Sequence, residues 1–277
     1  MLKLKTSLLA MAALGLSLVA LQAQAHKPWL LPSSTVVEGK EPWVTVDAAI
    51  SEGLFDIDHQ PLKLDGIVVT APDGSTPALQ NIGSGKLRNT FDVKLAKPGT
   101  YRIALVSQGV MGSYKDAAGE MKRFRGTEAT LAQDVPAGAS DVKLTRSHSR
   151  LETYVSAGTP DMAVFKPTGV GLEMVPVTHP NDLRSGEKAT WRFLLDGKPA
   201  AQQGVSLIPG GVRYRGTLGE IRKTTDANGE VSFELPAAGM YLLSTTWPAA
   251  AAPVPGQPPV MPARRASYAA TLEILPQ

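Results

Sequence analysis

Apolar and polar side chains alternate along much of this 277-residue chain, which is the pattern of β-strands with one buried face. Apolar residues take alternate positions between Leu87 and Leu95, and Tyr101, Ile103 and Leu105 resume the alternation after a Lys-Pro-Gly turn. We predict that these two segments pair as an antiparallel hairpin. Outside residues 1–25, we find no convincing run at the three- and four-residue spacing of an amphipathic helix.

The second half of the chain shows the same alternation with different turns. Residues 221–225 and 231–235 flank Asp226-Ala227-Asn228-Gly229, and an Asn-Gly pair indicates a hairpin because its glycine takes a positive φ. Short strands separated by turns at intervals of about 8–12 residues are typical of β-sandwiches and argue against a parallel α/β sheet. Further strands are predicted over 43–48, 67–70, 189–195, 205–208, 239–243 and 268–275.

The predicted strands fall into two groups, separated by a segment rich in proline and glycine. We predict an all-β protein with two antiparallel, immunoglobulin-like β-sandwich domains, over 26–160 and 171–277, joined by a linker over 161–170. Each half is long enough for a sandwich core of its own. Residues 248–262 contain six prolines and are predicted to form an exposed loop before the last strand.

The first 25 residues have the three parts of an export signal. Lys3 and Lys5 precede an apolar stretch, and Ala23-Gln24-Ala25 matches a small-residue cleavage site. We predict cleavage after residue 25 and a periplasmic protein; an uncleaved anchor is the alternative. Loss of the two lysines lowers the formal net charge from +3 to +1, so nothing favours nucleic acid as a partner. No later apolar run is long enough to predict stable membrane insertion.

Composition restricts the chemistry that the chain can perform. It contains no cysteine, which excludes disulfides, thiolate metal sites and thiol nucleophiles. The signatures of zinc proteases, α/β-hydrolases, phosphate loops and dinucleotide-binding loops are also absent from the sequence. A metal ion would therefore be bound by nitrogen and oxygen ligands, and the four histidines become the candidates.

Cleavage after Ala25 would make His26 the first residue of the mature chain. A free α-amino group and the imidazole Nδ1 of the same residue can chelate one ion, and such nitrogen donors suit copper, nickel, cobalt or zinc. Both kinds of group ordinarily titrate close to neutral pH, so both are available as ligands there. The alternative is that a histidine follows the cleavage site by chance.

Two further histidines are candidate ligands. His59 follows two carboxylates, Asp56 and Asp58, that could accept a hydrogen bond from its ring, although a solvated His–Asp pair is an equal alternative. His179 lies near the predicted domain boundary, where it could reach a site between domains or cap a turn. His148 is the weakest candidate, because an arginine on each side would oppose a bound cation.

Six motifs, of which three contain a histidine, carry a resemblance to a known family. The motifs are His26-Lys27-Pro28-Trp29-Leu30-Leu31-Pro32, Asp58-His59-Gln60-Pro61-Leu62-Lys63-Leu64-Asp65, Pro176-Val177-Thr178-His179-Pro180-Asn181-Asp182-Leu183, Leu195-Asp196-Gly197-Lys198-Pro199, Thr225-Asp226-Ala227-Asn228-Gly229 and Ala238-Gly239-Met240-Tyr241. They resemble those of the DUF4198 family over essentially the whole mature chain. The resemblance implies an exported β-sandwich protein that handles a divalent transition metal, since members are described as periplasmic components of cobalt or nickel uptake systems.

Three functions are consistent with these residues. We favour a non-catalytic accessory protein that binds nickel, cobalt or copper through His26, His59 and His179 and serves a membrane metal transporter. The first alternative is a copper-dependent oxidative enzyme that uses the N-terminal histidine, with Tyr101, Tyr114 or Tyr154 as an axial group. The second is a structural or carbohydrate-binding sandwich in which the histidines are incidental.

Overall fold

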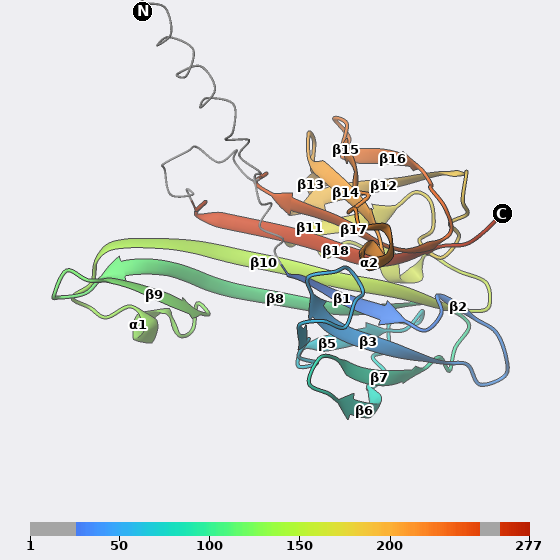
Figure 1. Cartoon of the computed structure of the whole chain (residues 1–277), viewed down its shortest axis with the longest axis horizontal. Coiled ribbons are helices and arrows are strands. Elements are labelled where there is room, and N and C mark those ends of the chain that lie inside the picture. Colours follow the sequence, from blue (N-terminus) through green and yellow to red (C-terminus); the bar gives the residue numbers. More distant parts are fainter. Residues whose placement is uncertain (1–25, 250–260) are drawn as a thin grey trace, which may run out of the picture.

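The computed structural model describes residues 26–249 and 261–277, and these residues are predominantly β-strand (Figure 1). The all-β prediction is confirmed. The predicted export signal and most of the predicted proline-rich loop lie outside the described residues. Among the helices of the described part, none has the length and apolar character needed to span a bilayer.

The strands form three sheets, of which the first is built only from the N-terminal half. Its order is β1 (Lys27–Pro32), β3 (Trp43–Ser51), β7 (Asn89–Lys94) and β6 (Gln80–Ser84), with β4 (Gln60–Pro61) beside β3. All its pairings are antiparallel.

The second sheet is the largest and contains strands from both halves. Its order is β15 (Ile221–Thr224), β14 (Gly204–Pro209), β17 (Gly239–Trp247), β18 (Arg264–Ile274), β10 (Ser140–Ala157), β8 (Gly99–Lys115) and β5 (Ile67–Thr70), with β2 (Val36–Val37) beside β10 and β9 (Met121–Gly126) beside β8. We call it the central sheet.

The third sheet belongs to the C-terminal half. It contains β11 (Leu172–Pro176), β12 (Lys188–Leu195), β13 (Lys198–Pro199) and β16 (Glu230–Glu234). Helical structure in the described residues is limited to short turns, α1 (Leu131–Asp134), η1 (Ala163–Phe165) and α2 (Val212–Arg215).

A hydrophobic core lies on each side of the central sheet. Between the first and central sheets, Phe91 packs in a cluster with Leu151 and Val155. Between the central and third sheets, Tyr154 packs in a cluster with Trp191. Because successive residues of a strand point to opposite faces, β10 supplies buried side chains to both cores.

The two predicted sandwiches therefore share a sheet. Strands β10 and β18 pair in parallel, with Arg146 opposite Arg264 and Thr153 opposite Thr271, so the expectation of purely antiparallel pairing is wrong at this junction. The predicted linker 161–170 contains η1, whose Phe165 is buried in the C-terminal core. Each core takes most of its residues from one half of the chain, but the sheet between them is continuous.

Both predicted hairpins are wrong, although the strands themselves form. Strand β7 pairs with β3 and β6, whereas β8 pairs with β5, β9 and β10. Likewise β15 pairs with β14, and β16 pairs with β12. In both cases the turn carries the chain from one sheet to another, so the apolar faces of the two strands meet across a core. Alternation predicts which face of a strand is buried but not which strand lies beside it.

Strands β8 and β10 continue well beyond both cores and form, with β9 and α1, a projecting arm over residues 106–149 (Figure 1). Ten residues of β8 lie in the arm, a length of about 33 Å for an extended strand. Within residues 106–149, all of which are described, only Val110, Thr145 and His148 are buried. The arm is thus a thin ladder held mainly by backbone pairing.

Candidate functional site

His26 and His59 lie together at the end of β3. Lys27 pairs with Ser51 at the start of β1, and Gln60 pairs with Ile50 through β4, so both histidines lie beside the same end of the same strand. Their imidazole rings are stacked, with centroids 3.8 Å apart and planes inclined by 10°. The fold thus joins two histidines that are distant in the sequence, and both are exposed.

A carboxylate completes this group. Glu52, the residue that follows β3, places Oε1 3.3 Å from Nε2 of His26. Both side chains are exposed to solvent. We call His26, Glu52 and His59 the histidine pair and its carboxylate.

The loop that carries His59 is anchored by several hydrogen bonds. The Asp58 carboxylate accepts bonds from the backbone N–H groups of Glu52 and Gly53, each at 3.0 Å. The buried Trp29 donates its indole N–H to Ser51 Oγ at 2.7 Å, and Ser51 Oγ donates to the Gly53 carbonyl at 2.6 Å. Asp58 therefore fixes the backbone of the loop rather than the ring of His59, contrary to the interpretation from sequence.

Two imidazoles and a carboxylate are suitable donors for a late first-row transition metal. Parallel stacked rings do not direct their lone pairs at one point, so a shared ion requires the rings to turn, which their exposure permits. Within residues 26–249 and 261–277, no three His, Asp or Glu side chains are arranged as a ready metal cluster. An ion bound by both rings would need a third strong ligand from elsewhere, such as the α-amino group that cleavage before His26 would create.

His179 does not belong to this group. Its Nδ1 accepts a hydrogen bond from the Asn181 N–H at 3.0 Å, and its Nε2 lies 2.9 Å from the Asp161 carbonyl and 3.0 Å from Thr100 Oγ1. Burial lowers the pKa of His179, against the opposing effect of the Asp161 carbonyl. Both ring nitrogens are therefore occupied by contacts within the protein, and the structure does not bring His179 together with His26 and His59.

His179 is also distant from the histidine pair. Asn181, two residues further on, donates its side-chain amide to the Thr35 carbonyl, beyond the C-terminal end of β1. His26 precedes the opposite end of that strand, whose six residues extend for about 20 Å. Through its bonds to Thr100 and Asp161, His179 instead ties β8 to the segment that follows β10.

His148 is buried, and its Nδ1 has no hydrogen-bond partner in the described structure. Burial lowers its pKa, and the charges of Arg150 and Arg264 lower it further. Its ring packs against Gly171, where an added Cβ would lie 2.1 Å from Nδ1. The low ranking of His148 as a cation ligand agrees with these surroundings.

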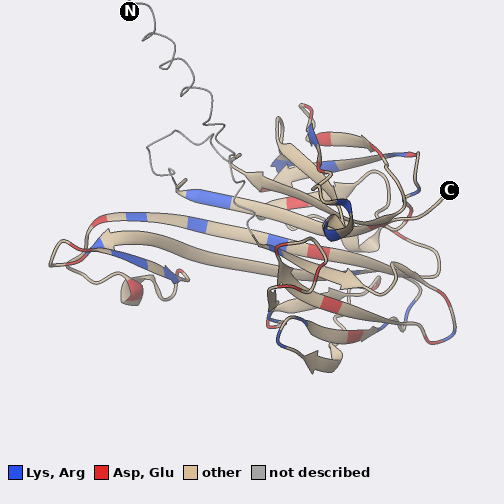
Figure 2. Ribbon diagram, in the orientation of Figure 1, with Lys and Arg blue, Asp and Glu red and all other residues tan. Residues whose placement is uncertain are grey.

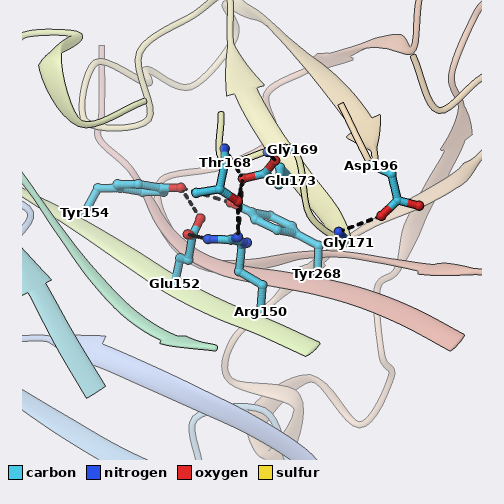
Figure 3. A network of polar contacts seen from close by, with 9 residues as sticks. All are labelled: Arg150, Glu152, Tyr154, Thr168, Gly169, Gly171, Glu173, Asp196 and Tyr268. Atoms are coloured by element: carbon cyan, nitrogen blue, oxygen red, sulfur yellow. Dashed lines mark hydrogen bonds and ion pairs between the residues drawn. The ribbon is translucent and has the colours of Figure 1, made fainter. Parts of the chain in front are cut away.

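A buried network of charges that was not predicted from the sequence lies beside the C-terminal core (Figure 3). Arg150 places Nη1 3.2 Å from Glu152 Oε1 and Nη2 3.3 Å from Glu173 Oε1. Tyr154 donates its hydroxyl to Glu152 and lies 3.1 Å from the hydroxyl of Tyr268. Burial raises the pKa of both tyrosines well above the ordinary value, so both remain protonated. The sequence signal that could have indicated this network is the alternation Arg-x-Glu-x-Tyr, which puts three polar groups on one face of a strand.

This network connects β10 to the segment that was predicted to be a linker. Glu173 accepts hydrogen bonds from the backbone and hydroxyl of Thr168 at 2.9 and 2.8 Å, and from the Gly169 N–H at 2.7 Å. The adjoining cavity measures about 10 Å³, room for about one water molecule. The network is too enclosed to be a substrate site, and its role is to hold the two halves together.

The two alternative functions depend on tyrosine and tryptophan side chains, whose positions are as follows. Tyr101 donates its hydroxyl to the Lys97 carbonyl, and Tyr154 is held in the buried network, so neither is an axial ligand beside His26. Tyr114 lies on the arm. Trp29 and Trp191 are completely buried and offer no stacking surface to a sugar ring, whereas Trp43 is exposed by 39%.

The family assignment follows from the sequence as a whole. A family model described as "Domain of unknown function (DUF4198)" matches residues 23–249. The chain belongs to the DUF4198 family. The DUF4198 match includes all three parts of the histidine pair and its carboxylate, as well as the arm. Among curated proteins, none matches the sequence.

Two solved structures share weak similarity with this DUF4198 protein. The D0–D1 domain of intimin is 13% identical, with 89% of this chain and 97% of that chain covered and a TM-score of 0.22. The Bacillus anthracis TIE protein is 10% identical, with 92% of this chain and 40% of that chain covered and a TM-score of 0.18. These TM-scores are too low for either structure to inform fold or function.

Proposed function

We propose that this protein is a non-catalytic accessory protein that binds one divalent transition metal ion, nickel, cobalt or copper, through His26 and His59. The observation that carries the proposal is the stacking of the two imidazoles at 3.8 Å on an anchored loop. Nitrogen donors favour the metals at the end of the first-row series, and Glu52 adds an oxygen donor beside His26.

The proposal includes export to the periplasm and cleavage after Ala25. Cleavage would free the α-amino group of His26, so that one residue supplies two nitrogen donors and His59 supplies a third. All three must be unprotonated to bind, so affinity falls as the pH drops from neutral towards about 5.

The position of the histidine pair suits transfer of an ion to another protein. Both rings are exposed at the end of β3, so a bound ion would remain accessible to a second set of ligands. A membrane metal transporter is the partner that the family resemblance implies, and the accessory protein would deliver the ion to it.

The test is a calorimetric titration of Ni²⁺, Co²⁺ and Cu²⁺ into protein that begins at His26. We expect His59→Ala to weaken binding by at least about tenfold, equivalent to about 1.4 kcal/mol, and one added residue before His26 to do the same. The matched control is His179→Gln, which removes an imidazole whose nitrogens are already occupied. Unchanged affinity in both the His59→Ala and the extended protein, or an equal loss in the control, would overturn the proposal.

A further inference from the structure

Several lysines and arginines lie along the strands of the arm (Figure 2), and the strand register shows that those on one face lack the carboxylate partners found on the other. Residues directly opposite one another on paired strands share a face, and the register puts Arg123 of β9, Ser113 of β8 and Lys143 of β10 in one row. Arg125 lies two residues along β9 on the same face. Arg265 of β18 lies opposite Ser147, which belongs to this face as well. We call Arg123, Arg125, Lys143 and Arg265 the basic face.

On the opposite face, each cation near the base and along the arm has a carboxylate partner. Lys122 lies 2.7 Å from Glu120, and Arg146 pairs with Glu128. Arg264, which lies opposite Arg146 on β18, pairs with an aspartate at 2.6 Å. This face is therefore close to neutral.

The four residues of the basic face form no ion pair with any carboxylate of the described chain. Residues 1–25 and 250–260 contain no Asp or Glu, so the chain has no further carboxylate except its C-terminus to offer them. All four side chains are exposed. The basic face is therefore a surface of cations without ion-pair partners, although Asp141, which pairs with Lys115 at 2.6 Å, also lies close enough to Lys143 for the charge of Lys143 to help lower the Asp141 pKa.

The outer strand of the arm also has an open edge. Within the described residues, β9 pairs only with β8, so no second strand occupies the other edge of its six residues, which include no proline. Helix α1 packs against β9 at one end, where Thr130 and Asp134 lie beside Gly126. An open edge can accept an added strand from another protein. Lysine and arginine on edge strands also discourage aggregation, but that role does not explain why the free cations gather on one face.

We propose that the open edge of β9 binds an extended acidic segment of a partner protein. A strand added there would place alternate side chains beside Arg123 and Arg125, at the Cβ separation of about 4.5–5.5 Å that cross-strand pairs adopt. Aspartate or glutamate at every second position is the complementary pattern. Lys143 and Arg265 extend the positive surface towards the body of the protein and attract the rest of the acidic partner.

The length of the arm agrees with this role. Neither core requires β8 or β10 to continue beyond residue 106 or before residue 149, since the clusters take their side chains from elsewhere. Strand β9 lies opposite residues 110–115 of β8, so its open edge begins about 13 Å beyond residue 106 and ends about 30 Å beyond it, where a partner can align with the edge. The proposal is independent of metal binding by His26 and His59.

The test uses the full chain and a labelled peptide about eight residues long in which glutamate alternates with threonine and valine, a length that can pair with all of β9. Fluorescence anisotropy at low salt measures binding, and hydrogen exchange locates it. We expect saturable binding, slower exchange of the β9 amides, and weakening by at least about tenfold in Arg123→Ser/Arg125→Ser. A peptide with the same residues in which the glutamates are consecutive should bind less tightly.

Two further pairs of substitutions keep the test decisive. Lys122→Ser/Arg146→Ser removes two cations from the opposite face of the same arm and should leave peptide binding unchanged. Arg123→Lys/Arg125→Lys keeps the charge and should retain most of the affinity, which separates loss of charge from loss of folding. Circular dichroism verifies that each variant is folded.

Other outcomes would overturn the proposal. Equal losses on the two faces, or binding without protection of β9, would show that attraction is general and that no strand is added. Binding to phosphatidylserine vesicles that requires the two arginines, together with no binding of the peptide, would identify an anionic membrane surface as the occupant instead of an acidic protein segment.

Discussion

Arg150→Met removes the guanidinium that lies between two buried carboxylates and replaces it with an uncharged side chain that still fills much of the space. Arg150, Glu152 and Glu173 are each exposed by 5% or less, and the two ion pairs measure 3.2 and 3.3 Å. After the substitution, both glutamates would be buried without their cation. We expect this to be among the most destabilising single changes in the protein.

The size of the stability loss depends on the hydrogen bonds that Glu152 and Glu173 retain after the substitution. Removal of one partner from a buried pair costs about 3–5 kcal/mol. Glu173 would retain three hydrogen bonds from Thr168 and Gly169, and Glu152 would retain the Tyr154 hydroxyl, so we expect about 4 kcal/mol rather than twice that figure. For a protein of this size, such a loss lowers the Tm by about 8–16 °C.

The assay is urea unfolding followed by tryptophan fluorescence at pH 7 and at about pH 4.5. Burial raises the pKa of Glu173, but hydrogen bonds from Thr168 and Gly169 and the charge of Arg150 outweigh it, so the pKa lies below the ordinary value. A carboxylate with a lowered pKa stabilises the folded state above its unfolded pKa, and this stabilisation is lost as the pH falls through the folded pKa. Without Arg150 the Glu173 carboxylate takes up a proton more easily, so the variant should lose less stability than the wild type on acidification.

Two results would refute this reasoning. A loss smaller than about 1 kcal/mol at pH 7 would mean that the network is worth no more than an exposed ion pair. A loss that is equal at both pH values would mean that the cost does not come from buried negative charge. The second variant, Arg150→Met/Glu173→Gln, should recover part of the stability at pH 7, because one of the two orphaned charges is removed.

Three further predictions concern packing around the same strands. Gly171 has a positive φ of +71°, so Gly171→Ala should destabilise the protein by roughly 1–2 kcal/mol through the backbone alone, and by more because the new Cβ meets His148. In a His148→Ala background, denaturant midpoints should show that the part of the loss due to this contact disappears and the backbone part remains. Burial and neighbouring arginines lower the pKa of His148, so the unfolded chain takes up a proton below about pH 6.5 that the folded chain resists; midpoints measured between pH 7 and 5 should show His148→Gln losing less stability than the wild type. Trp29→Phe removes the indole donor to Ser51 and should cost about 1–3 kcal/mol in urea unfolding.

The class of fold could be predicted from the sequence, but the neighbours of each strand could not. Alternation located the strands around Phe91 and Ile103 because a half-buried strand requires it. It could not show that these strands face each other across a core, since strands in one sheet and strands in opposed sheets have the same pattern. The parallel pairing of β10 with β18 joins residues 118 positions apart and depends on contacts that no local pattern records.

The candidate site was predictable in its residues and not in its geometry. His26 and His59 were selected for their chemistry and their neighbours, and only the register of β1, β3 and β4 explains why they meet. His179 does not join them, because its two ring nitrogens form hydrogen bonds with the Asn181 N–H and the Asp161 carbonyl. The alternative in which His179 caps a turn was the better interpretation.

The buried charges were missed because charged residues within a strand usually mark a solvent-exposed face. Arg150 and Glu152 alternate with Leu151 and Thr153, and this pattern predicts a strand with one solvent-exposed face and one buried face. In the structure β10 lies between two cores, so the face that looks wet is covered by the C-terminal half.

That arrangement has a consequence for the order in which the chain can fold. When only the residues up to about 160 are available, β10 can complete the N-terminal core, but its far face and the edge that later receives β18 remain uncovered. Arg150, Glu152 and the Tyr154 hydroxyl would then be hydrated. The partly folded chain would expose charged groups at this face, where exposed apolar side chains would promote aggregation. The segment from Phe165 to Met174 and the last strand, which carries Tyr268, together cover those groups, so both halves reach their native packing only when the C-terminal half is in place.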